Sequence, residues 1–325
     1  MESKRKILGT GILLITALIW GLGFPMQSMA LVHVGAATLT CVRNVIAGLF
    51  LLLVIAVFDR IRHTGRRLIE KTPRGLRPGF TRREAIGGLF CGILLGTATT
   101  LQQIGLSTEE TDSGKAAFIT ALYMVIVPLL GIFRRRFPSR RVFFSVGLAV
   151  IGSYLLSANI VFTGTGIGGF ISSLFRSGFH FAYGDLMVLL CAFVFAAHVV
   201  VIDIFTPDTD GIRMSCLQFF VASVITLPVM LIAEAPSFSA ILMAALPILY
   251  LGIFSSGVAY TGQIIGQKYI DVTVATLVLS LESVFGVLGG AVLLGEHKTI
   301  TQLVGCAVVF AAVIIAELPS RKSKK

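Results

Sequence analysis

A single carboxylate lies in the middle of a long apolar segment near the end of the chain. Glu282 is ten residues into the apolar run 272–294, where a charged side chain costs several kcal/mol and the protonated form is favoured. A carboxyl group in such a place can bind a polar ligand or exchange a proton. We therefore predict one of these roles for Glu282, with a structural hydrogen bond to a neighbouring helix, or a pair with Arg43, as the alternative.

Other polar side chains recur at helical spacing within apolar segments. Tyr260 and Gln263 belong to a stripe from Ser256 to Gln267 that follows one face of a helix. Polar groups inside a membrane usually face a cavity or another helix, so the stripe predicts a polar route, with helix–helix bonding as the alternative. The substrate-binding residues predicted on this reasoning are Trp20, Gln103, Thr120, Tyr123, Tyr260, Gln263, Ser280 and Glu282.

Two further segments contribute to this set. Trp20 is the only tryptophan and its indole face could wall a pocket, although a plain packing role is equally compatible with its position. Thr120 and Tyr123 lie one turn apart before Pro128, which cannot donate a backbone hydrogen bond to Met124 and tends to kink a helix. We predict a structural or gating role for Pro128.

Two other charged or titratable residues receive weaker predictions. Arg43 is seven residues inside an apolar segment, close enough to its end for the guanidinium to snorkel to the surface, so we predict a structural or gating role. His198 is a second candidate for proton coupling, although a lone histidine in a span more often makes a helix contact.

The composition requires a lipid environment for all of these groups. Hydrophobic residues make up 55% of the 325 residues, charged residues make up 13%, and the mean hydropathy is +0.91, whereas soluble domains carry about 25% charged residues. This excludes a soluble enzyme, a disordered chain and a nucleic-acid binder. Ten apolar segments are long enough to cross a bilayer: 7–28, 36–58, 85–106, 114–133, 140–158, 185–205, 212–233, 239–266, 272–294 and 299–318.

The basic residues predict the orientation of these segments. If the N-terminus is cytoplasmic, 23 of the 27 Lys and Arg residues fall on the cytoplasmic side and three fall on the outer side, which is the bias of a multi-pass membrane protein with both termini in the cytoplasm. The net charge of +11 therefore reflects topology and not nucleic-acid binding. The five cysteines lie in apolar runs and form no metal motif, so we predict neither a metal nor a cofactor.

The second half of the chain repeats the first. Thr40-Cys41-Val42-Arg43 aligns with Ser215-Cys216-Leu217-Gln218 at an offset of 175, Gly92 aligns with Gly252 at 160, and Val146-Gly147 aligns with Val304-Gly305 at 158. Five spans in each copy would make the copies opposite in orientation, a plan that recurs in secondary transporters. We predict an all-α integral membrane protein with ten transmembrane helices as two inverted five-helix repeats: 7–158, an external loop 159–184, 185–318, and a basic cytoplasmic tail 319–325.

Several of these residues also resemble a known family. The pair Trp20-Gly21, Arg43, the segment 114–123 with Pro128, and Leu279-Ser-Leu-Glu282 are similar to motifs of the EamA branch of the drug/metabolite transporter superfamily. The resemblance implies a ten-helix secondary transporter for small organic metabolites in the cell membrane. Where that family often has proline after the ninth-span Glu, this chain has Ser283, which removes the reason to expect a helix break there.

The combined prediction is a secondary transporter in a lipid bilayer. It moves an amino-acid-like or drug-like molecule by alternating access at a mid-membrane site between the repeats, with a proton as the candidate coupling ion. The alternative is an intramembrane enzyme acting on a lipid-phase substrate, which would need a nucleophile–base set or a metal site that the spacing does not provide. The sequence gives no oligomeric state.

Overall fold

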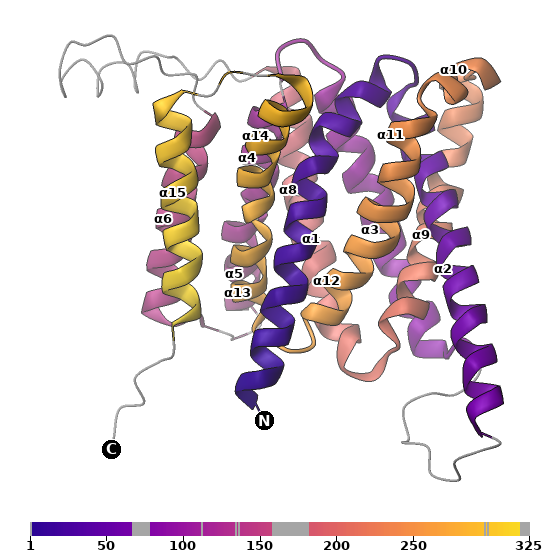
Figure 1. The fold of residues 1–325 in the computed structure, drawn as a ribbon, viewed down its shortest axis with the longest axis horizontal. Helices are drawn as coiled ribbons and strands as arrows, with labels where there is room; N and C mark the ends of the chain where they lie inside the picture. Colours follow the sequence, from indigo (N-terminus) through magenta and orange to yellow (C-terminus); the bar gives the residue numbers. More distant parts are fainter. Residues whose placement is uncertain are drawn as a thin grey trace.

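The computed structural model describes residues 2–66, 79–111, 113–133, 135, 137–157, 182–295, 297 and 299–318, and these residues form a helical bundle without a strand (Figure 1). Most of the predicted external loop and the whole predicted tail lie outside them. The elements are α1 (Glu2–Leu31), α2 (Ala36–Arg66), α3 (Arg82–Leu106), α4 (Ser113–Ala121), α5 (Tyr123–Phe133), α6 (Arg140–Ser157), α8 (Tyr183–Phe205), η1 (Thr206–Asp208), α9 (Gly211–Val229), η2 (Met230–Glu234), α10 (Phe238–Met243), α11 (Ala245–Leu249), η3 (Tyr250–Tyr260), α12 (Thr261–Gly266), α13 (Val272–Leu279), α14 (Leu281–Leu294) and α15 (Ile300–Glu317).

Nine helical segments of the described chain are long and apolar enough to cross a membrane. They coincide with nine of the ten predicted spans and make the chain a multi-pass membrane protein. The remaining prediction, 140–158, falls on α6, which is helical over 18 residues but begins with Arg140 and Arg141. The structure describes this helix as far as Ser157, so the tenth span stays a prediction.

Two of the spans are broken near their centres. The helix that contains Thr120 is interrupted at Leu122, between α4 and α5, and the helix that contains Glu282 is interrupted at Ser280, between α13 and α14. The ninth span is therefore broken, although it lacks the proline that would have been the reason to expect a break. Serine hydroxyls bond the backbone at this break: the Ser280 hydroxyl donates to Leu277 O at 2.8 Å, and the Ser283 hydroxyl donates to Ser280 O at 2.7 Å. Ser280 O also accepts from Ser283 N at 3.2 Å.

Pro128 does not mark the first of these breaks. It lies inside α5, and the interruption at Leu122 is two residues before Met124, whose carbonyl the proline leaves without its helical donor. The helix is thus interrupted at Leu122, two residues before Met124, where the sequence predicts the kink.

The first and last helices meet at one face of the bundle. Lys6 Nζ lies 2.8 Å from Glu317 Oε2, and the Thr10 hydroxyl donates to Glu317 at 3.2 Å. The start of α1 and the end of α15 therefore lie together, at the lower end in Figure 1.

Helices α6 and α15 pack against each other at one edge of the bundle, opposite α2 and α9 (Figure 1). The backbones of this pair meet at glycines: a Cβ on Gly305 would lie 2.6 Å from Leu156 N, and one on Gly152 would lie 2.8 Å from Val309 N. Gly147, which the sequence comparison pairs with Gly305, has nothing within 4 Å of such a Cβ. The close contact thus belongs to Gly152 and Gly305.

Because only Gly305 is in close contact, we predict that replacing glycine by alanine has opposite effects on stability at Gly305 and at Gly147. We expect Gly305→Ala to lower the free energy of unfolding by about 1–3 kcal/mol, because the methyl group must push α15 from α6. Gly147→Ala is expected to raise it by up to about 1 kcal/mol, because alanine is the better helix former. Unfolding of the purified variants in detergent measures both, and a stabilising Gly305→Ala would contradict the packing described here.

Candidate functional site

A polar cavity lies between the two halves of the chain. It has a volume of about 40 Å³, and described residues from both halves line it. The lining residues are Trp20, Phe24 and Gln27 of α1, Arg43 of α2, Gln102 of α3, Thr120 of α4, Tyr123 of α5, Phe195 and Val199 of α8, Ser255 and Tyr260 of η3, Gln263 of α12, and Glu282 of α14.

Most of the residues singled out from the sequence meet at this cavity. Six of the eight predicted substrate-binding residues line it: Trp20, Thr120, Tyr123, Tyr260, Gln263 and Glu282. Gln103 and Ser280 do not. Gln103 is buried outside the cavity lining and donates to Gln27 Oε1 at 2.7 Å. The Ser280 hydroxyl donates to the carbonyl of Leu277, one turn earlier in the same span.

Glu282 occupies the first turn of α14 and is 4% exposed. Its Oε1 has no hydrogen-bond partner, and neither has the Tyr123 hydroxyl or Gln263 Oε1. Tyr123 is an electrostatic neighbour of Glu282, but no hydrogen bond of standard geometry joins them. Buried polar atoms are normally paired, so these three atoms are available to bind a polar molecule in the cavity.

Arg43 points into the bundle and does not snorkel. The side chain is 3% exposed and donates to Ser256 Oγ at 3.1 Å, to Ser255 Oγ at 3.2 Å and to Gln27 Oε1 at 3.4 Å. The expected outward orientation is thus wrong, because neutral acceptors on η3 and α1 hold the guanidinium inside. No ion pair joins Arg43 to Glu282, both of which are described, so one cation and one carboxyl group face the cavity without neutralising each other.

An aromatic wall closes one side of the cavity. The rings of Trp20 and Tyr260 are 4.6 Å apart, and Trp20 Nε1 donates to the Ser255 carbonyl at 3.0 Å. That carbonyl lies in η3, an 11-residue π-helix. Because a π-helix closes its hydrogen bonds over five residues, its register differs from that of an α-helix and brings adjacent serines toward α2.

His198 lies behind the aromatic wall and does not line the cavity. Its Nε2 is 3.1 Å from Gln218 Oε1, and its ring packs edge-to-face on Tyr260 at 6.0 Å. Gln218 in turn donates to Ser215 Oγ at 3.3 Å. The histidine thus makes the helix contact that the sequence offered as its alternative role.

Some lining residues were not in the predicted set. Phe24, Gln27 and Gln102 fall in the polar or aromatic stripes of their segments, which is a usable signal. Ser255 is offset from the predicted stripe by one residue, and only the π-helical register brings it to the cavity. Phe195 and Val199 carry no sequence signal, since apolar lining residues look like any others in a span.

Comparisons with known proteins agree with this architecture. The model of the EamA-like transporter family matches residues 7–158 and 182–318. A protein of Archaeoglobus fulgidus described as an uncharacterized transporter is 28% identical over 317 residues, which cover 97% of this chain and 87% of the relative. A solved crystal structure matches with a TM-score of 0.67 at 16% identity over 99% of both chains, and at this identity it shows the fold alone.

Proposed function

Because the chain belongs to the EamA-like transporter family, we propose that it carries small organic metabolites across the cell membrane by alternating access at the cavity between its halves. The family and the transporter-named relative make it a membrane transporter and not an enzyme. The intramembrane enzyme considered from the sequence is therefore set aside.

The observation that carries the proposal is the set of unpaired polar atoms at the cavity. Oε1 of Glu282, the Tyr123 hydroxyl and Gln263 Oε1 come from both halves and make no hydrogen bond of standard geometry within the protein, although Tyr123 lies close to Glu282. A transported molecule that supplies donors and acceptors would satisfy them while bound and leave them unsatisfied on release. Weak, reversible binding of this kind suits a carrier.

Packing contacts support two inverted repeats, 7–158 and 185–318. A Cβ on Gly92 would lie 2.6 Å from Gln218 O and 2.5 Å from the Val221 side chain. A Cβ on Gly252 would lie 3.1 Å from the carbonyl of Arg43 and 2.7 Å from the side chain of Ile46. The glycines align at the offset of 160, and their partners align at 175, so the two contacts are related by the repeat.

The broken helices support the same plan. Discontinuous helices line the binding sites of many secondary transporters. Here Thr120 and Tyr123 flank the break of the first repeat. Ser280 forms the break of the second repeat and Glu282 follows it, and three of these four residues line the cavity.

The substrate class we propose is amino-acid-like or drug-like. Arg43 presents a cation, Glu282 presents a carboxyl group, and Trp20 and Tyr260 present aromatic faces. A molecule with separate polar groups on an apolar body complements this lining. Glu282 is our first candidate for the residue that binds a coupling proton, and His198 is the second. The distribution of Lys and Arg residues favours a cytoplasmic location for both termini.

The aromatic wall allows a matched test of the cavity. We expect Trp20→Phe to lower substrate exchange about three- to tenfold, because the Ser255 carbonyl loses its donor while the ring surface is largely kept. Tyr250→Phe is the control: it removes a similar bond, from the Tyr250 hydroxyl to Ile19 O at 2.9 Å, from a residue outside the cavity lining. Equal losses in the two variants would argue against the wall as a binding surface.

The proposed function is tested by a screen of labelled metabolites in proteoliposomes, with and without an imposed pH gradient. We expect at least one amino-acid-like or drug-like compound to show counterflow, in which internal unlabelled substrate accelerates uptake of the label. Absence of counterflow for every class tested, with protein shown to be folded, would contradict the proposal.

A further inference from the structure

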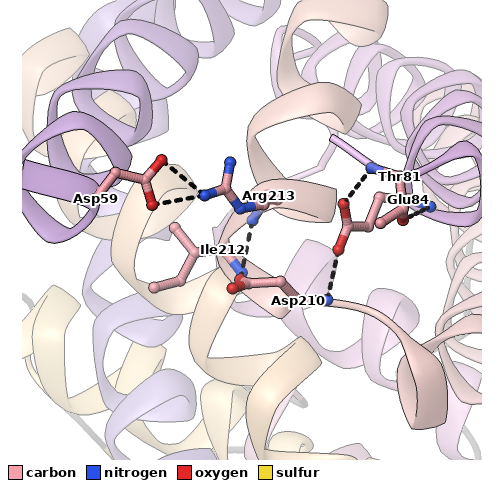
Figure 2. Close-up of polar contacts among 6 residues, drawn as sticks. All are labelled: Asp59, Thr81, Glu84, Asp210, Ile212 and Arg213. Atoms are coloured by element: carbon pink, nitrogen blue, oxygen red, sulfur yellow. Dashed lines mark hydrogen bonds and ion pairs between the residues drawn. The ribbon is translucent and has the colours of Figure 1, made fainter. Parts of the chain in front are cut away.

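The C-terminal end of α2 and the N-terminal end of α9 are joined by an ion pair whose arginine is nearly buried and whose aspartate is 30% exposed. Arg213 Nη2 lies 2.7 and 2.8 Å from the two carboxylate oxygens of Asp59 (Figure 2), and the arginine side chain is 6% exposed. The guanidinium also packs over the Phe80 ring at 5.6 Å. Hydrogen bonds between charged groups are about twice as strong as neutral ones. We call the contact between Asp59 and Arg213 the arginine clasp.

The start of α9 around this clasp is itself fixed. Asp210 caps α9 by accepting from Ile212 N at 2.9 Å, and its own N–H donates to Glu84 at 2.9 Å (Figure 2). Glu84, 4% exposed, also accepts from Thr81 N at 2.8 Å. Lys268 lies in the turn that follows α12. Burial lowers its pKa, and the carboxylates of Asp210 and Glu84 oppose this shift. These hydrogen bonds hold the N-terminal end of α9, which carries Arg213, against the start of α3.

The other end of α2 is joined by a different contact to η2, which follows α9 directly. The carboxylate of Glu234 accepts from Ala37 N at 2.8 Å, from Thr38 N at 2.7 Å and from the Thr38 hydroxyl at 2.6 Å. It approaches so closely that a Cβ on Gly35 would lie 2.3 Å from its Cδ. A carboxylate at the start of α2 also complements the helix dipole. We call this the helix-cap clasp.

The two clasps occupy equivalent positions of the proposed repeats. Asp59 and Glu234 are 175 positions apart, and so are Thr38 and Arg213, which is the offset found for these spans from the sequence. Between the clasps, Cys41 Sγ donates to Ser223 O and Cys216 Sγ donates to Gly48 O, each at 3.6 Å. These bonds obey the same offset, so the pair is held along its length by contacts that the repeat relates.

Both clasps are formed at once, at ends about 30 Å apart along α2. Alternating access requires gate contacts that open in turn at the two faces, whereas these close both ends of one helix pair together. None of the described residues that line the cavity comes from α9, so separation of α9 from α2 would not expose the site. From these contacts we infer that α2 and α9 form a fixed frame, which stays joined at both faces while other helices of the proposed carrier move.

The inference rests on the proposed function and is tested by reversible cross-linking. Cysteine pairs replace the clasps: Asp59→Cys with Arg213→Cys, and Thr38→Cys with Glu234→Cys. Ser28→Cys with Ser113→Cys is the matched control, because these hydroxyls are 2.8 Å apart and join α1 to α4, both of which line the cavity. The five native cysteines are buried and remain in place. A short bifunctional methanethiosulfonate joins each pair, and a reductant releases it.

We expect either clasp cross-link to leave more than half of the counterflow of the reduced protein, and the Ser28–Ser113 cross-link to lower it more than about tenfold until reduction. Loss of counterflow on cross-linking a clasp, restored by reduction, would show that α2 and α9 separate and would overturn the frame. Counterflow of each reduced variant is the baseline for its cross-linked form. If the reduced variants and the unmodified protein show no counterflow at all, the result contradicts the proposed function and not the fixed frame.

A second readout does not depend on transport. In a variant with both cysteine pairs, a fixed frame predicts that both cross-links form in the same molecules, which mass spectrometry of the intact protein detects. Cross-links that exclude each other would mean that the two ends close in turn and would overturn the inference.

Discussion

Replacing Glu282 with glutamine is expected to lower substrate exchange by more than about tenfold. The change keeps the shape of the side chain but removes the group that can ionise, and hydrogen bonds that a substrate donates to the ionised form contribute about 1.5–3 kcal/mol each. The residue is buried at the cavity and its Oε1 has no protein partner, so the lost interaction would be one with the substrate or a proton. Counterflow in proteoliposomes measures the effect.

The pH dependence of the same variant separates the two roles of Glu282. If the carboxyl group carries the coupling proton, Glu282→Gln should exchange substrate without responding to a pH gradient, whereas Glu282→Asp should keep the response. Glu109→Gln, in an exposed loop, is the control for a change of one carboxylate. Unchanged, still pH-dependent uptake by Glu282→Gln would remove the proton role.

The second large effect is expected at Gly21, where α1 touches α14. A Cβ there would lie 2.4 Å from Phe285 Cβ and 2.7 Å from the carbonyl of Glu282, so even alanine must push the helices apart. Trp20 and Glu282 lie on opposite sides of this contact. We expect Gly21→Ala to lower the free energy of unfolding by about 1–3 kcal/mol and to reduce counterflow strongly in the molecules that stay folded.

Gly11 provides the matched control in the same helix. A Cβ on Gly11 has nothing within 4 Å, so Gly11→Ala should be neutral or slightly stabilising and should transport normally. Thermal unfolding and counterflow, measured on the same preparations, separate loss of folded protein from loss of function. A Gly21→Ala variant as stable and active as Gly11→Ala would contradict the α1–α14 contact.

Hydropathy predicts the spans well because a bilayer imposes a minimum apolar length on every crossing. The breaks within spans are harder to predict. Pro128 indicates an irregularity but not its place at Leu122, and the break at Ser280 has no proline at all. There the hydroxyls of Ser280 and Ser283 donate to carbonyls three residues earlier. Hydroxyls also donate to backbone carbonyls within unbroken helices, as Ser223 does to Phe219 O, so a serine alone does not predict a break.

The cavity was largely predictable from its polar residues, because an unpaired polar group in hydrocarbon is costly and must face something. This reasoning selects Gln263, Tyr123 and Glu282. It fails for Arg43, since the distance from the span end permits snorkelling and only the tertiary contacts with Ser255 and Ser256 decide against it. It also fails for Val199, because an apolar lining residue does not differ in type from one that faces lipid.

The most direct measurement of the account is the accessibility of one cavity position from the two sides of a sealed vesicle. Val199→Cys introduces a thiol at the cavity wall without removing a polar group, and Leu288→Cys, on an exposed apolar helix face, is the control. The account predicts that impermeant thiol reagents label Val199→Cys from either side and that transported substrate slows both reactions. Labelling from one side only, or labelling that substrate does not change, would contradict a mid-membrane site with alternating access.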